Sequence, residues 1–291
     1  MPKKKGTQTI LVTGATGHQG GASLRRLRDS GFSVRALTRN PDEPNARAIT
    51  GPGVEVVRGD MSDRSSLLRA LDGVYGVHSV QPSKPGAETE IQEGFNVADA
   101  AKTSGVTHFV YSSVASADQN TGIPHFDSKR RIEEHIQGTG LHYTIVRPVF
   151  FMENWLMMRQ AIESGTLSLP LSPTTRLQMI AVADIGGVVA QAFTHPGKWQ
   201  NRIFELAGDE LSMSDLAQVF TRASGREVRY AQVPWEEFER QVGADYARMY
   251  RWFEETGYHV DIGAVRQEYH ALMSFEQWIN SSWHTTTRTA R

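Results

Sequence analysis

Residues 9–20, TILVTGATGHQG, decide the fold of this chain. Thr9–Thr13 is typical of a short buried strand, and a helix is expected over residues 18–29. The glycines between them permit a tight turn and a close approach to a ligand, and the free N–H groups at the helix start favour a pyrophosphate. We expect a dinucleotide-binding turn, although glycine turns also join strands to helices without any ligand, and the spacing G-x-x-G-x-x-G differs from the standard G-x-G-x-x-G. The candidate contacts are Gly14, Thr16, Gly17, His18, Gln19 and Gly20.

Short apolar runs alternate with helix-like stretches through the first half of the chain. This alternation is typical of a parallel sheet built from βαβ units. The sequence therefore predicts an α/β protein, with a Rossmann doubly wound parallel sheet, helices on both faces, and a smaller α/β C-terminal lobe. Six strands are expected, at residues 9–13, 32–39, 54–57, 75–80, 108–113 and 142–146.

Length and composition exclude several classes of protein. The 291 residues suffice for one large domain or two units. With 31 basic and 32 acidic residues, the net charge of −1 gives no overall field to hold nucleic acid or an anionic membrane. The absence of cysteine excludes disulfides and thiol nucleophiles, and the ten histidines form no ligand-type pair, so no metal site is expected. Because no apolar run is long enough for a membrane span or a signal peptide, we expect a soluble cytoplasmic protein.

The second expected strand ends at Arg39, 25 residues after Gly14. An NAD-specific site usually carries Asp or Glu there, to hold the ribose 2′-hydroxyl. A guanidinium can instead pair with a 2′-phosphate, which a carboxylate would repel. Arg39 therefore predicts NADP(H) as the cofactor, the alternative being an ordinary solvated arginine.

Two further loops follow expected strands at the same edge of the sheet. Asp60 and Met61 come after the third strand, where the loop commonly borders the adenine. Asp60 could accept a hydrogen bond from the adenine amine, or it could cap the helix expected near Ser65. The loop after the fourth strand should pass the middle of the cofactor, and this topology alone makes its residues candidates. They are Ser79, Val80 and Gln81.

Together these residues resemble the NmrA-like group of atypical short-chain dehydrogenases, over most of the chain. The resemblance implies a Rossmann domain that binds NADP(H) and a small C-terminal lobe that forms a cleft. The group includes quinone and enone-type reductases, and also redox-sensing regulators that bind NADPH with little or no catalysis. The matching segments are Val12–Gly17, Arg39, Gly59–Met61, Phe109–Ser113, Arg147–Asn154 and Asp184–Gly186.

Ordinary short-chain dehydrogenases carry Tyr-x-x-x-Lys on one helix face, with a Ser upstream. This chain has Ser113, then His125 in place of the Tyr, and Lys129 in the expected position. The resemblance implies that Lys129 holds the nicotinamide ribose. His125 is a candidate proton donor, since histidine titrates near neutral pH. Repulsion from Lys129 opposes its protonation, however, and a histidine at a helix start is often structural.

Aromatic and Met residues gather in two segments, 150–158 and 235–253. If both face the nicotinamide, they form an apolar cleft for a flat hydrophobic acceptor; otherwise they are an ordinary core. From the family pattern, Phe150 and Asn154 are expected nearest the nicotinamide.

The composition changes after Pro148, which indicates a domain boundary. Residues 1–150 are assigned to the NADP(H)-binding Rossmann domain, with 176–198 returning to it. Residues 151–175 and 199–284 are assigned to a substrate or partner lobe, and 285–291 to a disordered tail.

Two functions are consistent with these residues. One is an NADPH-dependent reductase of quinone-like or conjugated carbonyl substrates, because an activated acceptor asks less of a proton donor than a plain ketone. The other is a non-catalytic NADPH redox sensor that acts through a regulatory protein partner. We expect a hydrophobic, aromatic substrate for the first function and no nucleic-acid or membrane partner for either, and apolar helices in the second lobe favour a homodimer.

Overall fold

The computed structural model describes residues 8–82 and 86–283, so the predicted tail at 285–291 lies outside the described residues. The chain forms two compact units. Unit 1 comprises residues 1–147 and 185–204, and unit 2 comprises residues 148–184 and 205–291. The segment that returns to the first unit is thus 185–204, where the sequence suggested 176–198.

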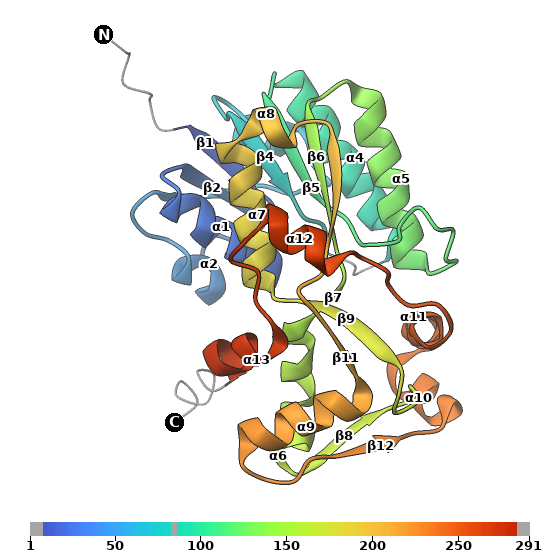
Figure 1. The fold of residues 1–291 in the computed structure, drawn as a ribbon. Helices are drawn as coiled ribbons and strands as arrows, with labels where there is room; N and C mark the ends of the chain where they lie inside the picture. The colour runs from blue at the N-terminus through green and yellow to red at the C-terminus, as the bar shows by residue number, and fades with distance from the viewer. Residues whose placement is uncertain (1–7, 83–85, 284–291) are drawn as a thin grey trace. The chain divides into compact units, whose positions relative to one another are not determined.

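Unit 1 is built on a seven-stranded sheet with the order β10-β6-β5-β4-β1-β2-β3 (Figure 1). The pairings that join β6, β5, β4, β1, β2 and β3 are all parallel. The strand order reverses between β1 and β4, and sheets of this kind bind ligands in the crevice beyond the carboxyl ends of such strands. The predicted Rossmann-like fold class is confirmed. The strands are β1 (Thr9–Val12), β2 (Ser33–Thr38), β3 (Val54–Arg58), β4 (Gly76–Ser79), β5 (His108–Ser112), β6 (Tyr143–Pro148) and β10 (Arg202–Leu206).

The edge strand β10 is the main difference from the predicted sheet. The sequence pattern predicts six strands and assigns residues 199–284 to the second lobe, but β10 lies beside β6. The Thr144 hydroxyl donates to the Trp199 carbonyl at 2.7 Å, and the Asn201 N–H donates to the Tyr143 carbonyl. Periodicity identifies a strand but not the sheet that it joins, because edge pairing depends on segments far apart in the sequence.

Helices cover both faces of this sheet (Figure 1). On one face, α3, α4 and α5 pack over a core that includes Leu11, Phe109 and Ile132. On the other face, α7 approaches α1 so closely that a Cβ at Gly186 would lie 2.7 Å from the Ala22 carbonyl carbon. The helices of this region are α1 (His18–Asp29), α2 (Pro44–Ala48), α3 (Arg64–Ala70), α4 (Ala87–Thr103), α5 (Pro124–Thr139), α7 (Val182–Thr194) and α8 (Pro196–Trp199).

Unit 2 holds two small sheets, of order β11-β9-β7 and β12-β8. Directly after β11, a capping box begins α9: the side chains of Ser212 and Asp215 each accept a hydrogen bond from the other's backbone N–H group. Gly225, in the left-handed conformation, ends this helix. The strands are β7 (Phe150–Phe151), β8 (Thr166–Leu169), β9 (Arg176–Ile180), β11 (Asp209–Ser212) and β12 (Arg229–Gln232). The helices are η1 (Met152–Met158), α6 (Arg159–Glu163), α9 (Met213–Ser224), α10 (Trp235–Val242), α11 (Ala244–Glu255), α12 (Ile262–Glu268), α13 (Phe275–Trp278) and η2 (Ile279–Trp283).

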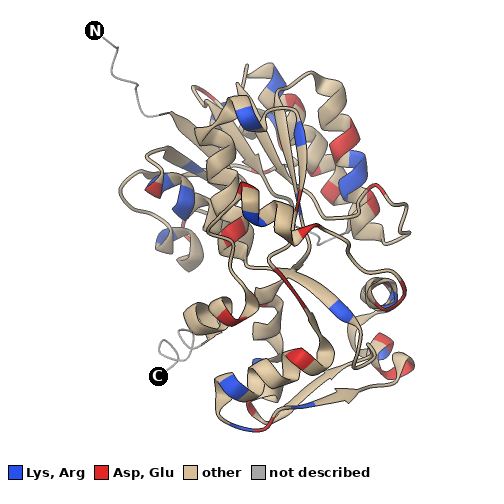
Figure 2. Ribbon diagram, viewed as in Figure 1, with Lys and Arg blue, Asp and Glu red and all other residues tan. Residues whose placement is uncertain are grey.

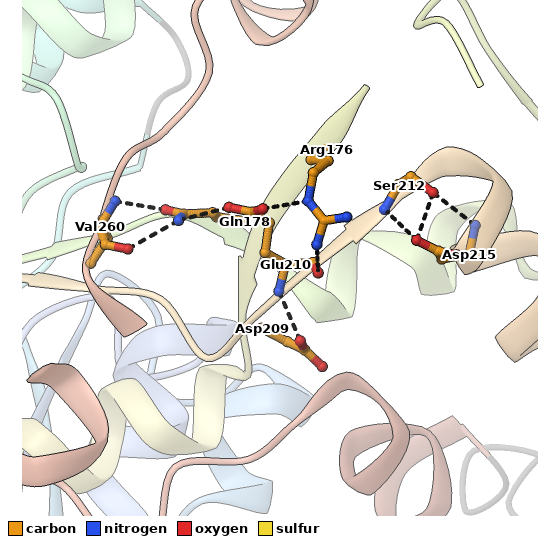
Figure 3. A network of polar contacts seen from close by, with 7 residues as sticks. All are labelled: Arg176, Gln178, Asp209, Glu210, Ser212, Asp215 and Val260. Carbon is orange, nitrogen blue, oxygen red and sulfur yellow. Dashed lines mark hydrogen bonds and ion pairs between the residues drawn. The ribbon is translucent and has the colours of Figure 1, made fainter. Parts of the chain in front are cut away.

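A polar network joins β9 and β11 to the segment before α12 (Figure 3). The Gln178 amide donates to the Glu210 carboxylate and to the Val260 carbonyl, each at 3.0 Å, and its oxygen accepts from the Val260 N–H at 2.9 Å. Arg176 completes the network through an ion pair with Glu210. Because these groups bond to one another, the network stabilises the packing of these three segments within unit 2.

Candidate functional site

The turn after β1 has the backbone geometry that its glycines predict. Gly14 has φ +59°, in the left-handed region, and the Gly17 N–H donates to the Gly14 carbonyl at 2.9 Å. A Cβ at Gly20 would lie 2.2 Å from the same carbonyl oxygen, so a larger residue does not fit there without movement. The first turn of α1 and the loop before it are therefore pressed together, and only glycine allows this.

The same turn is fixed to the loop after β4. The Thr13 hydroxyl donates to the Val80 carbonyl at 2.8 Å and accepts from the Val80 N–H at 2.7 Å. A Cβ on Gly14 would lie 3.2 Å from the Val80 carbonyl oxygen. The structure thus brings together Gly14 and Val80, two residues predicted to contact the cofactor, at the point where the strand order reverses.

The start of α1 is open to an anion. Gly17 is the N-cap, no side chain caps the helix, and its first turn carries no acidic residue. Thr16, Gly17 and His18 are exposed, whereas Gln19 is half-buried and accepts a hydrogen bond from the Ser112 hydroxyl at the end of β5. Exposed N–H groups at the positive end of a helix fit a pyrophosphate.

A cavity of about 450 Å³ lies at the carboxyl ends of β2 and β3. Arg39 is exposed there, directly after β2, as predicted for a residue that meets a 2′-phosphate. Two further arginines, Arg58 and Arg69, line the same cavity, and the sequence pattern gave no reason to select them because each resembles an ordinary surface residue. The lining residues are Arg39, Arg58, Gly59, Asp60, Asp63, Ser66 and Arg69.

Asp60 lies in this cavity and does not cap α3. Its carboxylate accepts from the Ser62 N–H at 2.8 Å, and the N-cap of α3 is Asp63, which accepts from the Ser65 N–H at 2.9 Å. The capping alternative for Asp60 is therefore wrong. Asp63 lies three positions closer to the helix and has the extended backbone that an N-cap requires.

Behind this cavity lies a group of buried polar side chains around Met61. Gln81 donates to the Ser79 hydroxyl at 2.8 Å, and Asn96 donates to the Met61 carbonyl at 2.9 Å. Among the described residues, Gln81 Oε1 and Glu93 Oε2 are buried without a hydrogen-bond partner. Burial raises the pKa of Glu93, and the nearby charges of Asp60 and Glu90 raise it further. Unpaired buried acceptors fit a ligand that brings N–H or O–H donors, as adenosine does.

The residues expected to perform catalysis lie at the end of β5 and the start of α5. Ser113 directly follows β5, and among the described residues its buried hydroxyl has no partner. The helix α5 begins at Pro124, so the half-buried His125 lies in its first turn. His125 and Lys129 are four residues apart and therefore share one helix face. Figure 2 shows that acidic and basic residues lie close together along this helix.

Lys129 is bound by a carboxylate that the sequence analysis did not select. Its Nζ lies 2.8 Å from Glu90 Oε1, and the Ser128 hydroxyl donates to the other oxygen of Glu90. The Glu90 side chain is 1% exposed and the Lys129 side chain 14% exposed. One signal was available in the sequence: Glu90 occupies the same helical stripe as Gly94, Val97 and Ala101, which are buried apolar residues.

Tyr111 cannot take the place of the missing catalytic tyrosine. It lies within β5, is fully buried, and has no hydrogen-bond partner among the described residues. Burial raises its pKa well above the ordinary value, and the charges of Glu90 and Glu133 act in the same direction. The side chains near Lys129 that remain as candidates are those of Ser113 and His125.

The aromatic segments of unit 2 pack mainly as a core. Phe150 lies 5.4 Å from Trp155 and 6.1 Å from Phe253 between ring centroids, and all three rings are buried. The burial of these side chains is consistent with an ordinary core. Asn154 is half-buried in η1. That Phe150 and Asn154 lie nearest the nicotinamide stays a prediction, since both belong to unit 2 and the glycine turn belongs to unit 1.

A parallel sheet with a glycine turn at its switch point is typical of Rossmann-type nucleotide-binding proteins. Comparison with known proteins gives the family. The family model described as "NmrA-like family" matches residues 6–279. An NAD(P)H azoreductase from Xenophilus azovorans is 34% identical over 235 residues, which cover 80% of each chain. The chain belongs to the NmrA-like family of NAD(P)-binding oxidoreductases.

Two solved structures show the same fold at lower identity. An NADPH-dependent quinone oxidoreductase from Escherichia coli, solved with NADPH, has a TM-score of 0.81 and 24% identity, over 94% of this chain and 99% of its own. NmrA, a negative transcriptional regulator, has a TM-score of 0.82 and 21% identity, over 98% of each chain. The fold is thus shared by a reductase and a regulator. Within the part of the chain that the structure describes, no helix is long and apolar enough to cross a membrane.

Proposed function

We propose that this protein is an NADPH-dependent reductase of quinone-like or conjugated carbonyl substrates. The observation that carries the proposal is the combination of an uncapped glycine turn after β1 with an arginine-lined cavity after β2 and β3. A relative at 34% identity is named an NAD(P)H azoreductase, whereas the regulator shares only the fold.

The preference for NADPH over NADH rests on Arg39. A 2′-phosphate bears up to two negative charges, and a guanidinium can donate two parallel hydrogen bonds to it. Asp60 and Asp63 in the same cavity oppose an anion, but Arg39, Arg58 and Arg69 outnumber them. A 2′-hydroxyl would gain little from three guanidinium groups, so the cavity supports NADPH.

The residues near Lys129 support reduction of an activated acceptor. When bound, NADPH would supply a hydride, and the acceptor would take one proton from His125, Lys129 or solvent. Reducing a plain ketone demands a proton donor in the transition state, the role of the tyrosine that this chain lacks. A quinone or enone delocalises the added charge and can take its proton late, so His125 at the tyrosine position is compatible with turnover.

The alternative is a sensor that binds NADPH without turnover. The histidine at position 125, where ordinary short-chain dehydrogenases carry their catalytic tyrosine, favours this alternative. A sensor must bind NADPH and NADP⁺ with different affinities or change shape between them, since equal affinities shift no equilibrium.

NADPH oxidation by the pure protein, followed by absorbance against quinones, enones and azo compounds, separates the two functions. Saturable turnover that falls in Lys129→Ala supports the reductase. Tight NADPH binding without turnover across the panel would contradict it and favour the sensor. The matched control is Lys198→Ala, since Lys198 lies in α8, outside the predicted site.

A further inference from the structure

We propose that Glu90 is a positioning residue, which holds the Lys129 ammonium in the orientation that binds the cofactor. This inference rests on the proposed NADPH binding and adds to it a residue that no catalytic motif in the sequence contains. The carrying observation is the pair itself, in which a carboxylate that is 1% exposed contacts Lys129 Nζ at 2.8 Å.

Close packing of α4 and α5 makes this contact possible. A Cβ at Gly94, one turn after Glu90, would lie 2.7 Å from Ile132 Cδ1, so only glycine lets α5 come this near. The side chains of Glu90, Ser128 and Lys129 meet across this narrow gap. The apolar side chains of both helices pack into the unit 1 core, which fixes the separation of the two helices.

The chemistry of the pair suits positioning rather than proton transfer. A lysine side chain is long and flexible, and an ammonium has three N–H donors. The contact with Glu90 uses one donor and fixes the end of the chain, while the remaining donors can reach a ligand's hydroxyl groups. The Ser128 hydroxyl fixes the second carboxylate oxygen in turn. Among the described residues, the only ion pair recorded for Glu90 is the one with Lys129.

The pair also sets the local charge. Without Glu90, Lys129 would be a nearly buried cation with no counter-ion, which burial disfavours. With Glu90, the pair is neutral overall, and Lys129 can remain charged inside the protein. This neutralisation also weakens the repulsion between Lys129 and a protonated His125 that the sequence suggested.

A second pair on the same helix provides a matched control. Glu133, which is fully buried, bonds Arg147 through both carboxylate oxygens at 2.9 and 2.7 Å. None of the predicted cofactor contacts lies in that pair. Glu133→Gln therefore measures what neutralising a buried carboxylate in α5 does when no cofactor contact is involved.

The test measures the Kd for NADPH of the full-length protein and of Glu90→Gln, Glu90→Asp, Lys129→Met and the Glu90→Gln/Lys129→Met double variant. We expect Glu90→Gln to raise the Kd about tenfold, as loss of a charge-assisted contact would. In the Lys129→Met background the same change should have no further effect, since Glu90 acts through Lys129. Glu90→Asp keeps the charge and should recover part of the affinity. The KM for NADPH should rise more than kcat falls, and Glu133→Gln should leave the Kd unchanged.

Circular dichroism and thermal melting establish that each variant is folded at the temperature of the measurement. If Glu90→Gln does not fold, the comparison of Glu90→Asp with Glu90→Asp/Lys129→Met replaces it. A folded Glu90→Gln with wild-type affinity would overturn the positioning role. So would an equal loss of affinity with and without Lys129, which would make Glu90 merely structural. A wild-type protein that does not bind NADPH would contradict the proposed function itself, and the positioning role would fall with it.

Discussion

Two buried carboxylates, Glu133 in α5 and Glu90 in α4, hold their cations in different ways. Glu133 receives two hydrogen bonds from the planar guanidinium of Arg147, which also donates to Asp118. Glu90 receives one hydrogen bond from the ammonium of Lys129. The Arg147 guanidinium uses its donors on two carboxylates of the protein, whereas the Lys129 ammonium uses one donor on Glu90 and keeps the others for a ligand. The difference suggests that the first pair stabilises the fold and the second prepares a binding site.

Breaking the Arg147 pair should give the largest effect on stability. Arg147→Met removes both hydrogen bonds to the buried Glu133 and leaves it only the longer ion pair with Arg130, at 3.7 Å, so we expect a loss of about 3–5 kcal/mol in the free energy of unfolding. Urea denaturation measures this loss. Lys129→Met should cost less, because Lys129 is 14% exposed and makes one contact with its carboxylate. Equal losses for the two variants would mean that the pairs are equivalent and would remove the contrast.

Replacing Arg39 tests whether the proposed cofactor carries a 2′-phosphate. Arg39→Ala should weaken NADPH binding roughly tenfold to hundredfold, as loss of a charge-assisted contact worth about 1.5–3 kcal/mol would. NADH binding should change little. Calorimetric titration of both cofactors gives the two ratios. Arg28→Ala, which alters an exposed arginine at the far end of α1, is the control. If both cofactors lost affinity equally, the assignment of Arg39 to the 2′-phosphate would be wrong.

His78 supplies the opposite case, a buried titratable group with no partner. Among the described residues neither ring nitrogen is bonded, and burial lowers the pKa of His78 to about 3. In the unfolded chain the pKa is about 6.5, so the unfolded state binds the proton first as the pH falls. Stability is therefore fully present above this value and is lost as the pH falls toward 3. Between pH 7 and 5 the loss should be about 2 kcal/mol for this group.

Chemical denaturation of His78→Leu at both pH values measures that contribution. The variant should lose about 2 kcal/mol less than the wild type over this interval. His108 should add a similar slope of its own, because burial, together with the nearby His142, lowers its pKa to about 4. An unchanged pH dependence in His78→Leu would show that folding does not lower the pKa of His78.

Gly94 offers the smallest and most local change. Gly94→Ala puts a methyl group within 3 Å of three Ile132 side-chain carbons, so the two helices must move slightly apart, and we expect a cost of about 1 kcal/mol. The added methyl should widen the gap between α4 and α5 near Lys129 and leave the Arg147 pair intact. The affinity for NADPH should then fall even at temperatures where the variant remains folded. An unchanged affinity for NADPH, together with a reduced stability, would show that the spacing of α4 and α5 does not affect cofactor binding.

The sequence predicted the parts of this site that depend on local chemistry. The glycine turn, the six strands β1 to β6 along the chain, and the position of Arg39 after β2 follow from residue types at fixed spacings. Asp60 was harder, because Asp60 and Asp63 both precede α3, and which of the two caps it depends on the hydrogen bonds that each carboxylate makes. Whether the aromatic segments form a core or line a cleft was ambiguous as well, because the same aromatic side chains suit either place.

The sequence by itself determined a Rossmann-type sheet with a glycine turn after β1, membership of the NmrA-like family, and a lysine at position 129 with histidine in place of the usual tyrosine. Only the tertiary structure decided that β10 completes the sheet and that Glu90 holds Lys129. The reason is physical. A turn or a cap is specified by neighbours in the chain, whereas an edge strand and a buried ion pair form between segments whose approach depends on how whole helices and strands pack.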